Sequence, residues 1–325
     1  MRRRLLGLIA ALGALAALAA LAACTAAPDR GESRSEAVTA SPSPSPSPSA
    51  SPSRSPSPSP SPKPLLQLPR GGRQLFPQFR VVAYYGSAYG PALGVLGRAD
   101  PDTSAARLVR AAAAFARPGR PVLPTFELIA TVANGFPTPR GTYSTPMSDR
   151  DIGRYLAAAR RHKLLMFLDV QPGRAEFLPE VRRYERWLRE PDVGLALDPE
   201  WKMGPGERPG GQIGHTDAAT VNAVSAFVAG IVAKYRLPQK LFIVHQFRDE
   251  MIVHREQIVT RPGLATVFHI DGFGSQGAKL RVYAALHVRP PFANGFKLFY
   301  LADHAMMSPA QALSLVPAPD LISYQ

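Results

Sequence analysis

Short apolar runs alternate with longer amphipathic segments along residues 65–325. Eight of these runs have the length and composition of buried β-strands. We expect strands at residues 80–85, 124–133, 164–170, 193–198, 240–246, 265–271, 296–303 and 320–325.

Between the runs, apolar residues recur at the three- and four-residue spacing of amphipathic helices. We expect helices at residues 103–116, 148–162, 175–189, 216–235, 277–287 and 309–315, and a weaker one at 250–259. Eight strands alternating with helices predict an α/β fold, a (β/α)8 TIM barrel. The eighth helix is expected to be absent, because the last strand ends at Gln325; residues 65–79 are the one segment that could take its place.

An open, doubly wound sheet is the alternative fold. Such sheets commonly carry a glycine-rich phosphate loop after the first strand. Here Tyr84-Tyr85-Gly86-Ser87 follows instead, which is not G-x-G-x-x-G. The barrel is therefore the favoured prediction.

The N-terminus has the pattern of an export signal. Arg2, Arg3 and Arg4 precede the apolar stretch 5–23, and small residues lead to Cys24. The run Leu21-Ala22-Ala23-Cys24 resembles a bacterial lipobox. The resemblance implies a signal peptide at 1–23, a lipid on Cys24, and attachment to the extracytoplasmic face of the cell membrane. The alternative is an uncleaved anchor, since 19 apolar residues can just span a bilayer.

Residues 24–64 show no apolar periodicity, and 41–62 are nearly pure Ser-Pro. Proline at every second position removes backbone donors and fixes φ, so polyproline II is the conformation that remains. We expect a disordered linker whose 22 Ser/Pro residues reach roughly 70 Å. Cys24 is the single cysteine, which excludes disulfides within the chain.

Charge adds a hint about partners. Residues 65–325 contain 31 of the 38 basic and 21 of the 24 acidic side chains, a net charge of +10. A basic exported domain favours acidic wall polymers or anionic lipid over nucleic acid. The alternative is a compositional bias toward Arg and Ala without functional meaning. We expect a monomer without cofactors.

Polar residues fall where several predicted strands end. Asp169, Asp198, His245 and Asp271 close the third to sixth strands. Barrel active sites lie at this C-terminal face, built from strand ends and the loops that follow. Acidic residues at one strand end are ordinary, but acids at several ends facing one side predict a site.

The fourth strand gives the sharpest signal. Along 193–201, Gly194, Ala196, Asp198 and Glu200 alternate with leucines, so the small residues and both carboxylates share the side toward the barrel axis. Two carboxylates this close raise each other's pKa, which lets one stay protonated as a general acid. Trp201 could stack on a sugar ring. The plain alternative is a solvated acidic pair that caps the strand.

Asp198-x-Glu200 at the end of a fourth strand resembles the end of the D-G-x-D-x-D-x-E motif of family 18 chitinases. The first strand, Val81-Val-Ala-Tyr84-Tyr85, is also similar to theirs. The resemblance implies that Glu200 donates the proton and that Asp198 assists it and orients an N-acetyl group. Val193 and Ala196 stand where the motif has acids, so an ordinary two-carboxylate mechanism is the alternative.

These observations predict a glycosidase-like barrel that acts on a wall or environmental polysaccharide. The catalytic candidates are Glu200, Asp198, Asp271 and Asp169, the last two as rivals for the second carboxylate of a glycosidase. The substrate-contacting candidates are Trp201, Tyr84, Tyr85, Gln246, His245 and Tyr324.

Two other functions stay open. Asp169, Asp198, His245, His269 and Asp271 could bind zinc or manganese in a metal-dependent hydrolase. No H-E-x-x-H stands in the sequence, and the favoured prediction has no metal. The barrel could also bind glycans without cleaving them.

Overall fold

The structure is a computed structural model that describes residues 64–325. The predicted signal peptide, the lipid site at Cys24 and all but Pro64 of the predicted linker lie outside the described residues, so those predictions stay untested.

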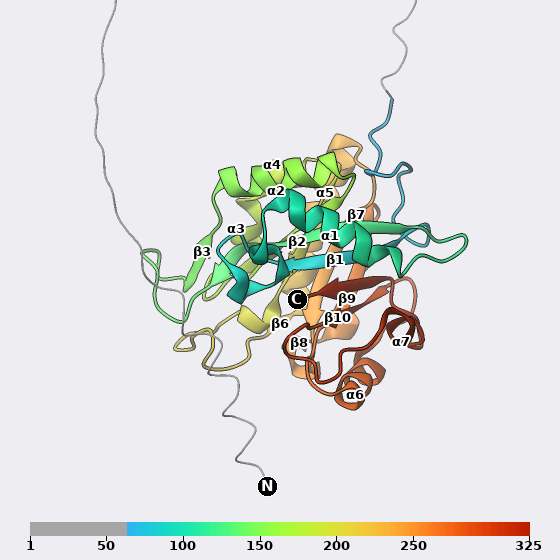
Figure 1. Cartoon of the computed structure of the whole chain (residues 1–325). Helices are drawn as coiled ribbons and strands as arrows, with labels where there is room; N and C mark the ends of the chain where they lie inside the picture. Colours follow the sequence, from blue (N-terminus) through green and yellow to red (C-terminus); the bar gives the residue numbers. More distant parts are fainter. Residues whose placement is uncertain (1–63) are drawn as a thin grey trace, which may run out of the picture. The chain divides into compact units, whose positions relative to one another are not determined.

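Eight parallel strands close into a barrel (Figure 1). Each strand pairs with the next along the chain, and β1 pairs with both β2 and β11, which closes the ring. The barrel strands are β1 (Arg80–Gly86), β2 (Val122–Ala133), β4 (Leu165–Val170), β5 (Val193–Leu197), β7 (Lys240–Gln246), β9 (Leu264–Ile270), β10 (Ala293–Leu298) and β11 (Leu321–Tyr324). The predicted TIM-barrel fold is confirmed, and no helix follows β11 within residues 64–325.

Helices connect the strands on the outside of the barrel (Figure 1). They are α1 (Pro101–Ala113), α2 (Asp149–Arg161), α3 (Phe177–Arg182), α4 (Glu185–Leu188), α5 (Ala218–Tyr235), α6 (Gln276–Leu286) and α7 (Pro309–Leu313). Short strands β3 (Ser144–Pro146), β6 (Thr216–Asp217) and β8 (Ile252–Val253) lie in the loops, as do the 3-10 turns η2 (Pro91–Leu93), η3 (Val95–Arg98), η4 (Pro199–Trp201), η5 (Asp249–Met251) and η6 (Arg255–Gln257).

Three predicted elements differ from the structure. The helix expected at 175–189 is two short helices, α3 and α4, separated by Arg183 and Tyr184; the Tyr184 hydroxyl donates to the Ala130 carbonyl at 2.6 Å. The weak helix at 250–259 is replaced by η5, β8 and η6. The seventh strand ends at Leu298, five residues early, because Asp303 turns the chain by accepting the Phe299 N–H at 2.9 Å and pairing with Lys279 at 2.8 Å.

Two apolar layers hold the barrel together. Leu195 and Leu197 on β5 belong to the outer layer, packed with the helices, while Ala196 belongs to the inner layer that fills the barrel. This is the alternation expected from the sequence. Helix α5 is long and apolar enough to cross a membrane by length and composition, but Val221 and Val228 pack into the outer layer.

The N-terminal end of the barrel is covered by residues 64–79. Leu68, Leu75 and Phe79 pack against the inner layer at this end of the barrel. Arg73 anchors this segment by donating to the Leu237 carbonyl at 2.9 Å. The segment therefore closes the end of the barrel and does not stand in for the missing eighth helix beside the strands.

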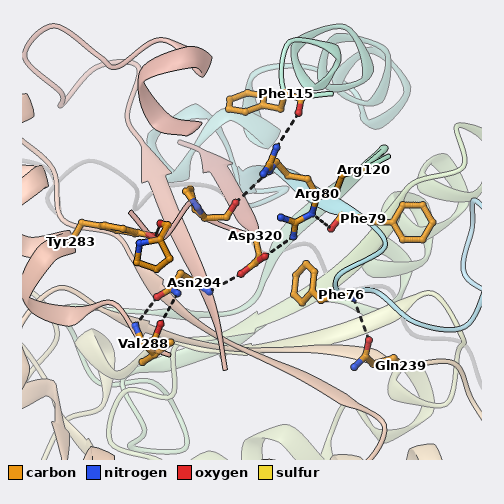
Figure 2. A network of polar contacts seen from close by, with 12 residues as sticks. Phe76, Phe79, Arg80, Phe115, Arg120, Gln239, Tyr283, Val288, Asn294 and Asp320 are labelled. Carbon is orange, nitrogen blue, oxygen red and sulfur yellow. Dashed lines mark hydrogen bonds and ion pairs between the residues drawn. The ribbon is translucent and has the colours of Figure 1, made fainter. Parts of the chain in front are cut away.

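Polar contacts fasten the seam where the last strands meet the first (Figure 2). Asp320, just before β11, accepts from Arg120 at 2.5 Å and from the Asn294 N–H of β10 at 3.2 Å. Arg80, at the start of β1, donates to the Pro319 carbonyl at 3.3 Å. These contacts lie at the end of the barrel opposite the strands' carboxyl ends, and they stabilise closure rather than form a site.

We expect Gly194→Ala to destabilise the protein. A Cβ there would lie 2.7 Å from the Leu241 carbonyl oxygen and 3.3 Å from the Phe167 Cβ, inside a filled barrel. Overpacking of this kind costs about 1–3 kcal/mol, measurable by denaturant unfolding. The control is Gly230→Ala, at an exposed position of α5 where an added Cβ would have no atom within 4 Å. This substitution should raise the free energy of unfolding by about 0.5–1 kcal/mol. Equal stabilities for the two variants would contradict this account of β5.

Candidate active site

The carboxyl ends of the strands bring eight ionisable side chains together. Glu127 of β2, Asp169 of β4, His245 of β7, His269 of β9 and Lys297 of β10 point inward above the apolar inner layer. Asp198 and Glu200 follow β5, and Asp271 follows β9. We call these eight residues the mouth cluster. All are buried except Glu200, which is partly exposed at the rim.

His245 is the best-connected member. Its Nδ1 lies 2.8 Å from Asp271 Oδ2, and its Nε2 lies 3.0 Å from Glu127 Oε1. Only the Asp271 contact has hydrogen-bond alignment. His245 thus joins carboxylates from opposite sides of its ring, with its side chain fully buried.

His269 and Lys297 complete the basic side of the cluster. His269 Nδ1 lies 3.4 Å from His245 Nδ1, and its Nε2 lies 3.1 Å from Ser323 Oγ of β11. The Lys297 ammonium lies 3.6 Å from the Tyr85 ring centroid and 3.8 Å from Asp271. A cation over an aromatic face is stabilised when both are desolvated, so Lys297 stays charged inside the barrel.

Several buried carboxylate oxygens have no hydrogen-bond partner. In the mouth cluster these are both oxygens of Glu127, both of Asp169 and one each of Asp198 and Asp271; Glu180 of α3 has one more elsewhere. Buried polar groups are nearly always satisfied in folded proteins, so unmade bonds gathered in one place indicate a site arranged for a ligand. The four residues line the same end of the barrel.

Three carboxyls of the mouth cluster resist ionisation. Burial, followed by the charges of Asp198 and Asp271, raises the pKa of Glu200 to about 8. Burial also raises the pKa of Asp198 to about 6, with Asp271 adding repulsion. For Asp169, burial and then Asp198 raise the pKa well above its usual range.

The other carboxyls are held ionised. Burial alone would raise the pKa of Asp271, but His245 and Lys297 outweigh it and lower the pKa to about 2. Burial likewise opposes ionisation of Glu127, yet the close approach of His245 and the charge of Lys297 lower its pKa. Desolvation lowers the pKa of His269 to about 3, which leaves that ring neutral. The environments therefore separate proton-holding from ionised carboxyls, the arrangement needed for acid–base chemistry.

The structure brings together most of the residues expected from the sequence. Glu200, Asp198, Asp271, Asp169 and His245 all belong to the mouth cluster. Tyr85 borders it, with its hydroxyl accepting from Gln171 at 2.9 Å. Trp201 follows Glu200 in η4 and is partly exposed.

Three expected substrate contacts lie elsewhere. Tyr84 and Tyr324 belong to the outer layer, with ring centroids 6.1 Å apart, because they alternate with inward residues on β1 and β11. Gln246 alternates with His245 and donates to the carbonyls of Arg248 and Asp249 in the loop after β7. The structure separates all three from the mouth cluster.

Glu127 and Lys297 were not expected from the sequence. Each is the one charged residue of its strand, at an inward position. Burial of a charge in mid-strand is costly unless it is paired, so an isolated charge within such a run was the available signal.

Glu127, His245 and His269 could also bind a metal ion. One candidate ligand atom from each lies within 4.8 Å of the others, and all three side chains are buried. Asp271 contacts His245 Nδ1 and Ser323 contacts His269 Nε2, and contacts of this kind orient ring ligands in metalloenzymes.

No protein-family model, no curated protein and no solved structure matches this chain. The similarity to family 18 chitinases therefore rests on the motif residues alone.

We expect Asp169→Asn to stabilise the protein near neutral pH by about 0.5–2 kcal/mol. The substitution removes a carboxyl whose ionisation burial and Asp198 oppose. Because the folded-state pKa of Asp169 lies above its usual value, the gain should appear above about pH 4 and vanish at lower pH. Thermal unfolding across pH would measure it.

The control for Asp169→Asn is Asp303→Asn. Asp303 is equally buried but paired with Lys279 at 2.8 Å, so its neutralisation should cost about 3–5 kcal/mol. Destabilisation by Asp169→Asn would show that its carboxylate is satisfied in solution.

Proposed function

We propose that the mouth cluster is the active site of a glycoside hydrolase, with Glu200 as general acid and Asp198 as its partner. The observation that carries the proposal is the position of Glu200, which lies partly exposed at the rim with the buried carboxyls of Asp198 and Asp271 in the same cluster; burial and these two charges raise its pKa to about 8. It is protonated at neutral pH and accessible to a leaving-group oxygen. Asp198 maintains this state, because its negative charge disfavours ionisation of Glu200.

A second carboxylate is needed beside the scissile bond, and Asp271 fits better than Asp169. His245 and Lys297 keep Asp271 ionised, whereas Asp169 holds its proton. An ionised carboxylate stabilises the positive charge that develops on the sugar in the transition state. Glu200 would donate its proton as the glycosidic bond breaks, and Asp271 would act on the opposite side, as nucleophile or as base toward water.

The distribution of aromatic residues supports a saccharide substrate. Within residues 64–325, four aromatic side chains are about half exposed: Tyr89, Phe136, Phe273 and Tyr300. Each lies in a loop that follows a barrel strand, β1, β2, β9 and β10 respectively, on the face that holds the mouth cluster. Exposed aromatics offer flat apolar faces, which suit the apolar faces of sugar rings.

The proposal extends to location. A lipid on Cys24 and the Ser/Pro linker would hold the barrel at the outer surface of the cell membrane, within reach of a wall or environmental polysaccharide. A polymer fixed in the wall suits a tethered enzyme, because both the enzyme and its substrate then stay in the same place.

We expect Glu200→Gln to reduce kcat by roughly 10²–10⁴-fold on whichever polysaccharide the parent protein cleaves in a defined panel. The parent's activity should fall above about pH 8 as Glu200 loses its proton, and below about pH 6 as Asp198 gains one. Asp198, Asp271, Lys297 and His245 are the charged groups that act on Glu200.

The control is Glu250→Gln, an exposed acid in η5 after β7, which should keep parental activity and pH dependence. In Glu200→Gln, the alkaline limb of the pH profile should disappear from the residual activity. Parental turnover in Glu200→Gln would remove Glu200 as the acid.

Metal-dependent hydrolysis is a second candidate, favoured by the grouping of Glu127, His245 and His269. Three protein ligands with one open position are typical of catalytic zinc. On this alternative, the purified protein should contain about one equivalent of metal by elemental analysis, as expected for a single three-ligand site. His269→Ala should lose the metal and Glu200→Gln should keep it. Full activity after chelation, with no metal detected, would reject this candidate and leave the glycosidase proposal intact.

A further inference from the structure

A hollow of about 220 Å³ lies on the outer side of β1, near the carboxyl end of that strand. Its lining consists of Tyr84, Val95, Arg98, Ser104, Arg107 and Tyr300. Tyr84 precedes Tyr85, which borders the mouth cluster, and Tyr300 follows β10 at the same end of the barrel. The hollow therefore lies at the same end of the barrel as the mouth cluster, on the outer side of the barrel wall.

Two guanidinium groups face this hollow without a partner among residues 64–325. Arg98 ends η3 and Arg107 lies in α1; both are exposed, and neither makes an ion pair or a side-chain hydrogen bond there. The acids next to them in sequence are occupied elsewhere. Asp100 caps α1 by accepting the Thr103 N–H at 3.0 Å, and Asp102 pairs with Arg161 at 2.6 Å.

The aromatic side of the hollow is fixed by packing. Tyr300 stacks on Tyr324 with centroids 5.2 Å apart, and Tyr324 packs edge-on against Tyr84. The hollow thus combines a rigid aromatic wall with two free cations. Guanidinium groups bind carboxylates and phosphates through charge-assisted hydrogen bonds, and an aromatic wall suits a sugar ring that carries such a group.

We propose that this hollow is a subsite for an acidic sugar unit, whose carboxylate or phosphate binds Arg98 and Arg107. The net charge of +10 on residues 65–325 favours approach of an acidic polymer. Anion binding here stands on its own. The further step, that the mouth cluster cleaves the same bound polymer, rests on the proposed function.

The test is binding of defined oligosaccharides to the full chain carrying Glu200→Gln, which prevents turnover. Titration calorimetry would compare an oligogalacturonate, a glycerol-phosphate oligomer and a neutral cello-oligosaccharide of similar length. At least one acidic oligomer should bind more tightly than the neutral one and weaken with salt. Preference between the two acidic oligomers identifies carboxylate or phosphate as the ligand.

The double variant Arg98→Gln/Arg107→Gln should weaken acidic-oligomer binding by about tenfold or more, given the usual strength of charge-assisted bonds. The matched control is Arg110→Gln, an exposed arginine one turn further along α1 that does not line the hollow. It should retain parental affinity.

Equal losses in the double variant and in Arg110→Gln would overturn the proposal, as would no preference for either acidic oligomer. These outcomes are independent of catalysis. Parental turnover in Glu200→Gln would reject the glycosidase proposal while leaving acid binding at Arg98 and Arg107 in place.

Discussion

The contact of His245 with Asp271 is the interaction on which the mouth cluster depends. Its fully buried ring also approaches Glu127, and so links β7 to the acids of β2 and β9. The buried imidazolium and its carboxylate partners stabilise one another, because removal of one of these charges would leave another without compensation. Burial works against the charged ring, but Asp271 and Glu127 together raise the pKa of His245 well above its usual range.

The same cluster contains more acid than base. Five carboxyls face only His245 and Lys297 as charged partners, since the His269 ring is neutral. Protons must therefore stay on some of the acids, and burial and mutual repulsion decide which ones. Asp271 lies nearest the cations and is ionised, while Glu200 at the rim keeps its proton. The positions of His245 and Lys297 thus decide which carboxyl stays ionised and which keeps its proton.

The sequence predicted the barrel well because its strands are continuous apolar runs, whose period and spacing are local properties. It predicted the acids that end strands, such as Asp198 and Asp271, because the first polar residue after an apolar run marks the end of a buried strand. It missed Glu127 and Lys297, whose burial depends on partners from distant strands. Tyr84 and Tyr324 face outward and not toward the mouth cluster, because a shift of one residue along a strand reverses the face that a side chain points to. The sequence pattern alone does not show which face a residue at a strand end takes.

The segment 64–79, which covers the N-terminal end of the barrel, also fixes an orientation. The described chain enters at the end opposite the strands' carboxyl ends, where Leu68 and Leu75 seal the inner layer. The first described residues and the acidic end therefore lie at opposite ends of the barrel, so the segment that seals the inner layer does not cover the mouth cluster.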